Sequence, residues 1–173
     1  MNFDVIGPIE ITRHGRKKII TKQSASEFRN QLEDIEEGLA DSCGCYVFAK
    51  RAGKGIIPWY VGQACRSRMG MEALNAENRS KYNDVLEGKG TPVLFVIPAR
   101  TPTGKLRRRP SKALQTLSFL EKYLIAAALD RNPTLINSKE TRFMRELHVV
   151  GILNPKKGEA TTASRDLYKT LFS

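Results

Sequence analysis

The chain has 173 residues, of which 40% are hydrophobic and 27% are charged, a balance typical of a folded globular protein rather than a disordered one. Its longest helical apolar stretch, at 124–129, is too short to span a bilayer, which argues against a membrane protein. With 29 Lys and Arg against 18 Asp and Glu, the formal net charge of +11 favours nucleic acid as the partner over a membrane or an acidic protein.

We expect one domain, residues 1–173, located in the cytoplasm, because a core can form at this length without crosslinks and Met1 begins no targeting segment. The chain has an odd number of cysteines, Cys43, Cys45 and Cys65, so we expect reduced thiols rather than disulfides. A zinc site is a less favoured alternative, since the two histidines lie far from the cysteines in sequence.

The first part of the chain, 1–41, predicts an N-terminal extension made of a β-hairpin and a helix. β-forming residues at 3–12 and 18–21 flank a short turn and predict the hairpin. Ser24 and Glu27 have the spacing of a capping box, which predicts that an amphipathic helix starts there.

The central part of the chain predicts an antiparallel hairpin followed by helices and another strand. Two runs of β-branched and aromatic residues, 45–49 and 56–62, flank a loop of glycines and charged residues. Short helices are expected at 68–74 and 81–87, and the run at 92–97 predicts a third, buried strand.

A basic loop and a long helix come next. Residues 100–111 are rich in proline and arginine and predict a mobile loop, and apolar periodicity then predicts a helix at 112–130. Glu121 falls beside the apolar stripe of this helix. Since burying a bare carboxylate is costly, Glu121 needs a cation, a metal or a cleft, unless it reaches solvent or pairs with a lysine at the edge of the core.

The last part, 141–173, predicts a C-terminal extension. It has a candidate strand at 148–153 and a helix at 162–172 that we expect to turn Leu167 and Leu171 inward.

Several features, taken in chain order, resemble the GIY-YIG nuclease family. They are Gly44-Cys45-Tyr46, Tyr60-Val61-Gly62, a downstream arginine, Glu121 on a helix, and Asn137 after Pro133. The resemblance covers about residues 42–140, the expected nuclease core. It implies an α+β fold with a small antiparallel sheet of about three strands flanked by helices.

The same resemblance implies a metal-dependent endonuclease that hydrolyses phosphodiester bonds in DNA. Glu121 would hold Mg²⁺ or Mn²⁺, and Tyr46 and Tyr60 would position or activate the attacking water. An arginine would stabilise the transition state, and Asn137 would hold the site together by hydrogen bonds or approach the DNA backbone. The expected catalytic residues are therefore Tyr46, Tyr60, Arg68, Glu121 and Asn137.

The arginine is where the chain departs from the family pattern, because Gly70 stands at the usual position. Arg66 and Arg68 are the nearest candidates. On one helix they would point about 200° apart, so only one can face the tyrosines, and we predict Arg68.

Substrate capture is expected from cations that contact phosphates and give salt-sensitive binding. The predicted nucleic-acid-binding residues are Lys54, Arg66, Lys105, Arg107, Arg108, Arg109 and Lys112. Cutting both strands would require a homodimer or two successive nicks, and cleavage of RNA stays open. The alternative function is a domain of the same fold that binds nucleic acid or another partner without cutting.

Overall fold

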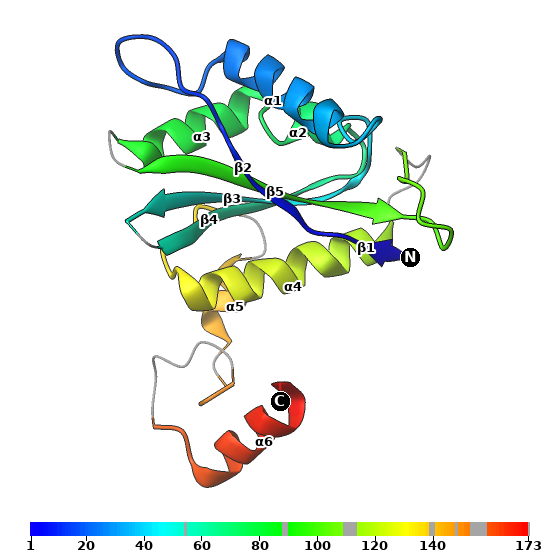
Figure 1. Ribbon diagram of the computed structural model, residues 1–173. Coiled ribbons are helices and arrows are strands. Elements are labelled where there is room, and N and C mark those ends of the chain that lie inside the picture. The colour runs from blue at the N-terminus through cyan, green and yellow to red at the C-terminus, as the bar shows by residue number, and fades with distance from the viewer. Residues whose placement is uncertain are drawn as a thin grey trace.

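The computed structural model describes residues 1–53, 55–87, 90–108, 114–138, 141–147, 149–152 and 159–172. Its centre is an antiparallel sheet with helices on both faces, so the fold class is α+β (Figure 1). The strands of the described residues are β1 Asn2–Phe3, β2 Ile6–Glu10, β3 Gly44–Ala52, β4 Gly55–Ala64 and β5 Thr91–Arg100.

The predicted hairpin is confirmed. β3 pairs with β4 from Gly44 opposite Ala64 to Ala52 opposite Gly55, and β3 also pairs with β5 on its other side. Because β3 is central, its side chains alternate between two buried faces. Tyr46 lies in the core on one face of the sheet and Cys45 in the core on the other.

The prediction of about three strands is wrong, because β1 and β2 both pair with β5 and bring the sheet to five strands. The predicted N-terminal hairpin is also wrong: a single bridge joins His14 and Ile19. One side of β5 pairs with β3, and the backbone groups on its other side also need hydrogen-bond partners. Strands β1 and β2, within the first ten residues of the chain, provide them. Local β propensity cannot distinguish this distant partner from a neighbouring one.

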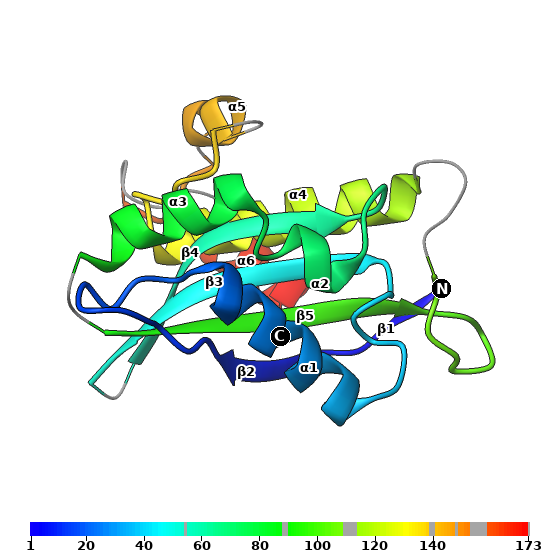
Figure 2. The same ribbon diagram turned by 90° about the horizontal axis from the view of Figure 1, so that it is seen from above.

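Helices cover the two faces of the sheet unequally. Figures 1 and 2 show α1 Lys22–Ile35, α2 Met69–Glu72 and α3 Ala76–Leu86 on one face and α4 Gln115–Arg131 on the other. These four helices were predicted, but α1 begins earlier than Ser24. Thr21 is its cap and accepts a hydrogen bond from the Ser24 backbone at 3.3 Å, while the Ser24 hydroxyl accepts one from the Thr21 backbone at 2.9 Å.

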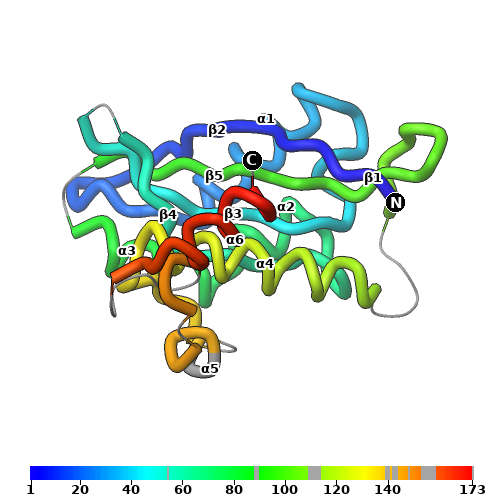
Figure 3. Tube along the Cα trace, turned by 90° about the horizontal axis from the view of Figure 1, so that it is seen from below, coloured from blue at the N-terminus to red at the C-terminus, as the bar shows by residue number. Residues whose placement is uncertain are grey.

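The C-terminal part lies on the α4 side of the sheet, where Figure 3 shows α5 Thr141–Glu146 and α6 Thr162–Phe172. Helix α6 has its predicted bounds, but Leu167 and Leu171 are 47% and 57% exposed, so the prediction that they turn inward is wrong. Of the predicted strand at 148–153, the described residues 149–152 form a turn in which the Ile152 backbone donates to the Val149 carbonyl at 2.8 Å. Within the described residues, no helix is both long and apolar enough to cross a membrane.

The guanidinium of Arg100, at the end of β5, forms hydrogen bonds to two other segments of the chain. Arg100 donates to both carboxylate oxygens of Glu36, at 2.8 and 2.6 Å, and also to Asp4. It thereby links β5 to the end of α1 and to the chain after β1. The hydrogen bond from Arg100 is the main reason that the pKa of Glu36 lies below its usual value.

This linkage predicts a pH-dependent contribution to stability. Because the pKa of Glu36 is lowered on folding, its contribution is complete above the ordinary carboxyl pKa and is lost as the pH falls through the folded value. Glu36→Gln should lower the free energy of unfolding by up to about 1 kcal/mol at pH 7 and by less in acid. Urea titrations at pH 7 and in acid would measure both differences, and a difference independent of pH would contradict the assignment.

Candidate active site

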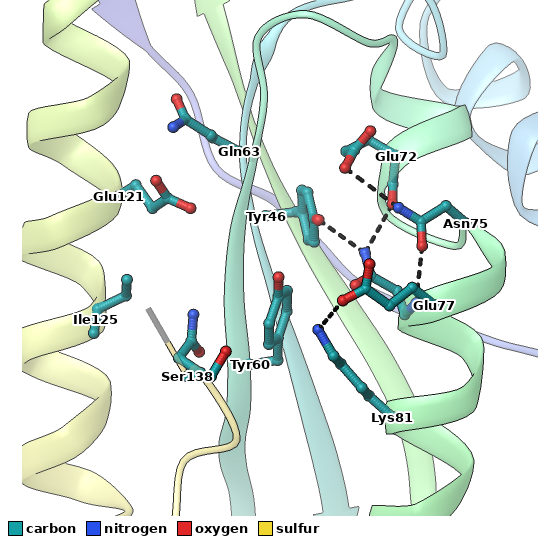
Figure 4. Close-up of a pocket in the computed structure, with 12 residues that line it drawn as sticks. Tyr46, Tyr60, Gln63, Glu72, Asn75, Glu77, Lys81, Glu121, Ile125 and Ser138 are labelled. Carbon is teal, nitrogen blue, oxygen red and sulfur yellow. Dashed lines mark hydrogen bonds and ion pairs between the residues drawn. The ribbon is translucent and has the colours of Figure 1, made fainter. Parts of the chain in front are cut away.

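A cavity of about 420 Å³ opens at the β4 edge of the sheet, between α3 and α4 (Figure 4). Four of the five predicted catalytic residues line it: Tyr46, Tyr60, Glu121 and Asn137. They come from β3, β4, α4 and the segment after α4, so the fold brings distant parts of the sequence to one place.

The two motif glycines make this geometry possible. Tyr46 lies directly opposite Gly62, and a Cβ on Gly62 would come within 2.4 Å of the Tyr46 Cζ and hydroxyl oxygen. The Tyr46 ring therefore crosses β4 at a residue without a side chain and reaches toward the edge of the sheet. Gly44 has a similar role against β5, where a Cβ would lie 2.2 Å from the Ile97 carbonyl oxygen.

The two phenols lie close together and are held by neighbours. Their ring centres are 6.2 Å apart, and Asn78 donates its side-chain amide to the Tyr46 hydroxyl at 3.0 Å. Burial raises the pKa of Tyr46 well above its ordinary value, with the charges of Tyr60 and Glu72 acting in the same direction and the hydrogen bond from Asn78 opposing them. Both phenols thus keep their protons at neutral pH unless a cation comes near.

Tyr60 lies near three carboxylates that influence its protonation. Burial is the first cause of its raised pKa, followed by the negative charges of Glu121, Glu77 and Glu72. All three glutamates line the cavity with it. The cavity is therefore acidic, and a phosphate group could enter it only if cations offset these charges.

Glu121 comes to the cavity from the opposite face of the sheet to α3. It is partly buried on α4, between the buried residues Leu117 and Ile125. The negative charge of Glu121 also affects Cys45 on β3. Burial is the first cause that raises the pKa of the Cys45 thiol to about 12, and the charge of Glu121 is the second. The sequence prediction of a carboxylate beside a cleft is consistent with this position.

Gln63 is the neighbour of Glu121 that bears on metal binding. Its amide oxygen is buried and accepts no hydrogen bond from any described residue, and the side chain lines the same cavity. In Figure 4 the amide lies beside the Glu121 carboxylate with its nitrogen toward it, and a half-turn of the amide exchanges the two atoms. Carboxylate and amide oxygens are hard ligands, so Glu121 and Gln63 fit Mg²⁺ or Mn²⁺.

The protein would supply only part of such a coordination shell. Among the described residues, no three His, Cys, Asp or Glu side chains form a group that could hold a metal ion. Magnesium sites often have one or two protein ligands, with water and substrate phosphate filling the rest, and the cavity suits that type.

Asn137 clamps the edge of the sheet. Its side chain accepts from the Val61 backbone at 2.9 Å and donates to the Val61 carbonyl at 2.7 Å. Asn132 donates to the Pro58 carbonyl at 2.8 Å and the Ile136 backbone to the Trp59 carbonyl at 2.9 Å. Two roles were expected for Asn137, to hold the site together or to approach the DNA backbone. Its hydrogen bonds to Val61 correspond to the first.

The predicted arginine is not brought to the cavity. Arg68 precedes α2 and pairs with Asp41 at 3.2 Å, and neither Arg68 nor Arg66 lines the cavity. A side chain at position 70 would not reach it either, because a Cβ on Gly70 would lie 2.7 Å from Arg29 Cγ and would point toward α1. Helix α2 has only four residues here, so helical angles counted from Arg66 do not apply.

Lys81 is the one cation among the described residues that line the cavity. Its ammonium lies 2.6 Å from Glu77 and 5.5 Å from the centre of the Tyr60 ring. Lys81 and Asn78 were not among the predicted site residues, because the helix was expected to start at 81, whereas α3 begins at Ala76. The signal that could have found them is Asn75, whose side chain caps α3 and accepts from the Asn78 backbone at 2.8 Å.

The predicted nucleic-acid-binding residues that the structure describes do not line the cavity. Lys105, Arg107 and Arg108 are on the loop after β5, and Lys54, Arg109 and Lys112 lie outside the described residues. The described part of the loop, 101–108, is held by backbone bonds at 2.8 Å, from Arg107 to the Ala99 carbonyl and from Cys43 to the Arg107 carbonyl. A mobile loop was predicted, whereas these two hydrogen bonds attach the described part of the loop to the rest of the fold.

Comparisons of the chain with protein-family models, with curated proteins and with solved structures find no match.

The close contact between Gly62 and Tyr46 predicts a specific cost of substitution. Gly62→Ala should destabilise the protein by about 1–3 kcal/mol, because the new methyl group must displace a buried ring. Gly55→Ala, at the exposed start of β4 where a Cβ meets no atom closer than 4.0 Å, is the matched control and should change little. Urea denaturation of both variants measures the difference, and equal effects would show that the contact is not tight.

Proposed function

We propose that this protein is an endonuclease of the GIY-YIG type that hydrolyses phosphodiester bonds in DNA and depends on a divalent cation. The observation that carries the proposal is the convergence of Tyr46, Tyr60, Glu121 and Asn137 on one cavity. Chance placement of these four residues along the chain would not direct them to one opening.

The cavity offers each group that the reaction needs. A divalent cation bound by Glu121, with Gln63 beside it, would neutralise charge on the scissile phosphate and on the leaving oxygen. The hydroxyls of Tyr46 and Tyr60 orient the attacking water through hydrogen bonds, and Asn78 fixes the Tyr46 hydroxyl. Asn137 keeps β4, and with it Tyr60, in place.

Lys81 takes the role that the sequence analysis gave to Arg68. Its ammonium lies 5.5 Å from the centre of the Tyr60 ring, and a positive charge brought to the phenol would favour loss of its proton when the water is activated. It also faces the space where the phosphate would lie and stabilises negative charge there. Lysine does this as a point charge, without the two-pronged geometry of arginine.

A second candidate function is a domain that binds nucleic acid without cutting it. The observation in its favour is that none of the described arginines lines the cavity, although Lys81 supplies a positive charge.

The proposal predicts metal-dependent nicking that requires Glu121. Supercoiled plasmid should be nicked in Mg²⁺ or Mn²⁺ but not in chelator, and Glu121→Gln should lower the rate by at least about 100-fold, because it removes the charged ligand. Glu159→Gln, an exposed residue outside the cavity, is the control and should nick like the wild type. A wild-type protein that binds DNA and RNA in several forms but nicks none would support the binding function instead.

Lys81 gives a separate prediction. Lys81→Met should reduce the nicking rate at saturating DNA by roughly 100-fold, while Lys81→Arg, which keeps the charge, should retain most of it. The rate should be measured across pH 6–9, because removing the charge beside Tyr60 should also move the rising limb to higher pH. If Lys81→Met nicks as fast as the wild type over this range, Lys81 has no part in the reaction.

A further inference from the structure

A second hollow lies next to the candidate active site, on the face of the sheet that carries α1, α2 and α3. It has a volume of about 360 Å³ and is lined by three cations, Lys22, Arg29 and Arg79. All of its lining residues are described, and none of them is a carboxylate. We call it the basic groove. Figure 2 shows the three helices side by side over the sheet in this region.

Each of the two arginines contacts a neighbouring residue that limits its freedom. Arg79 is partly buried and donates to the Leu74 carbonyl at 2.6 Å, and Arg29 approaches the sulfur of Met71 at 3.0 Å. Gly70 makes room for Arg29, since a Cβ there would lie 2.7 Å from Arg29 Cγ. Guanidinium groups fixed in this way lose little further freedom when they bind a phosphate.

The basic groove adjoins the candidate active site. Asn75 lines both of them. Its side chain accepts from the Asn78 backbone at 2.8 Å, and the Asn78 side chain in turn donates to the Tyr46 hydroxyl at 3.0 Å. One residue of α3 thus separates the phenol from Asn75 at the end of the groove.

The charges on the two sides of Asn75 are opposite. Glu72, Glu77 and Glu121 line the cavity, whereas the groove has three cations and no carboxylate among its described lining residues. A polyanion with one phosphate in the acidic cavity would be repelled on most sides and attracted along the groove. A neighbouring phosphate of the same strand would lie outside the cavity, and the groove is a cationic surface next to it.

We infer that the basic groove binds the phosphate backbone of the nucleic-acid strand next to the cleavage position. The inference rests on the proposed function, because that function places the scissile phosphate in the cavity. It identifies Lys22, Arg29 and Arg79 as substrate-binding residues, in addition to the cations of the loop after β5. Contacts of this kind fix the position of the strand and carry no base specificity.

The salt dependence of DNA binding tests the inference without cleavage. Binding of a fluorescent DNA duplex with a single-stranded tail is measured by anisotropy in chelator, over a series of salt concentrations. The triple variant Lys22→Gln, Arg29→Gln, Arg79→Gln should lower the slope of log affinity against log salt by about 0.7–0.9 for each phosphate that the groove no longer neutralises, or roughly 2–3 in total.

A control with the same change of charge separates a local contact from bulk electrostatics. Arg131→Gln, Arg165→Gln, Lys169→Gln also removes three cations, none of which lines the groove, so both variants lower the formal net charge from +11 to +8. The control should keep a slope close to that of the wild type. Equal slopes for the two triple variants would overturn the inference.

Two further measurements keep the outcome clear. The variant Arg29→Lys, Arg79→Lys keeps the charge and should retain most of the wild-type slope. The thermal midpoint of each variant is measured alongside, so that a loss of binding caused by misfolding is recognised. A groove variant that binds like the wild type, in a protein that still nicks plasmid, would overturn this inference alone. A wild-type protein that binds no DNA would overturn the proposed function with it.

Discussion

The close passage of the Tyr46 ring over Gly62 is the contact on which the candidate site depends. A side chain on the central strand of a sheet normally ends in the core, because the neighbouring strand blocks its way to the edge. Here the neighbouring residue has no side chain, so the Tyr46 hydroxyl reaches Asn78 at the β4 edge. The glycine is therefore required by the tyrosine and not by its own backbone conformation.

Several other features of the site follow from that crossing. Tyr60, two residues before Gly62, places its ring 6.2 Å from Tyr46 and 5.8 Å from Tyr82. Helix α3 packs above these rings and contributes Asn78 and Lys81, while α4 brings Glu121 from below. Opposite faces of one sheet thus contribute to a single opening, which is possible only at an edge. Among the described lining residues Lys81 alone offsets part of the acidic charge of Glu72, Glu77 and Glu121.

Sequence reasoning predicted those parts of the fold whose signals are local. The hairpin of β3 and β4, helix α4 and the bounds of α6 follow from periodicity and turn composition. The pairing of β1 and β2 with β5 joins residues that are 98 positions apart for Asn2 and Arg100 and 83 for Glu10 and Val93, and no local pattern contains that information. Leu167 and Leu171 show a limit of local patterns as well. Their spacing places them on one face of α6, but it does not show whether another element covers that face, and both are exposed.

The same distinction applies to the candidate site. Tyr46, Tyr60, Glu121 and Asn137 were predicted from an ordered resemblance, and the structure places them together. Arg68 was predicted from the directions that side chains would have on a helix containing Arg66 and Arg68. Helix α2 has only four residues and begins after Arg68, so those directions do not apply. Gln63 was missed because nothing in its own neighbourhood of sequence marks it, and Lys81 because the start of its helix was placed too late. They matter through what lies beside them in space.

The segment after α4 has a consequence for how copies of this protein could associate. Asn132, Ile136 and Asn137 occupy the outward hydrogen-bonding groups of Pro58, Trp59 and Val61 on β4. These groups are what an incoming strand of another molecule would bind. Along this stretch of β4 the sheet cannot be extended by another strand, so copies of the protein that associate on this side of the sheet meet through helices or loops.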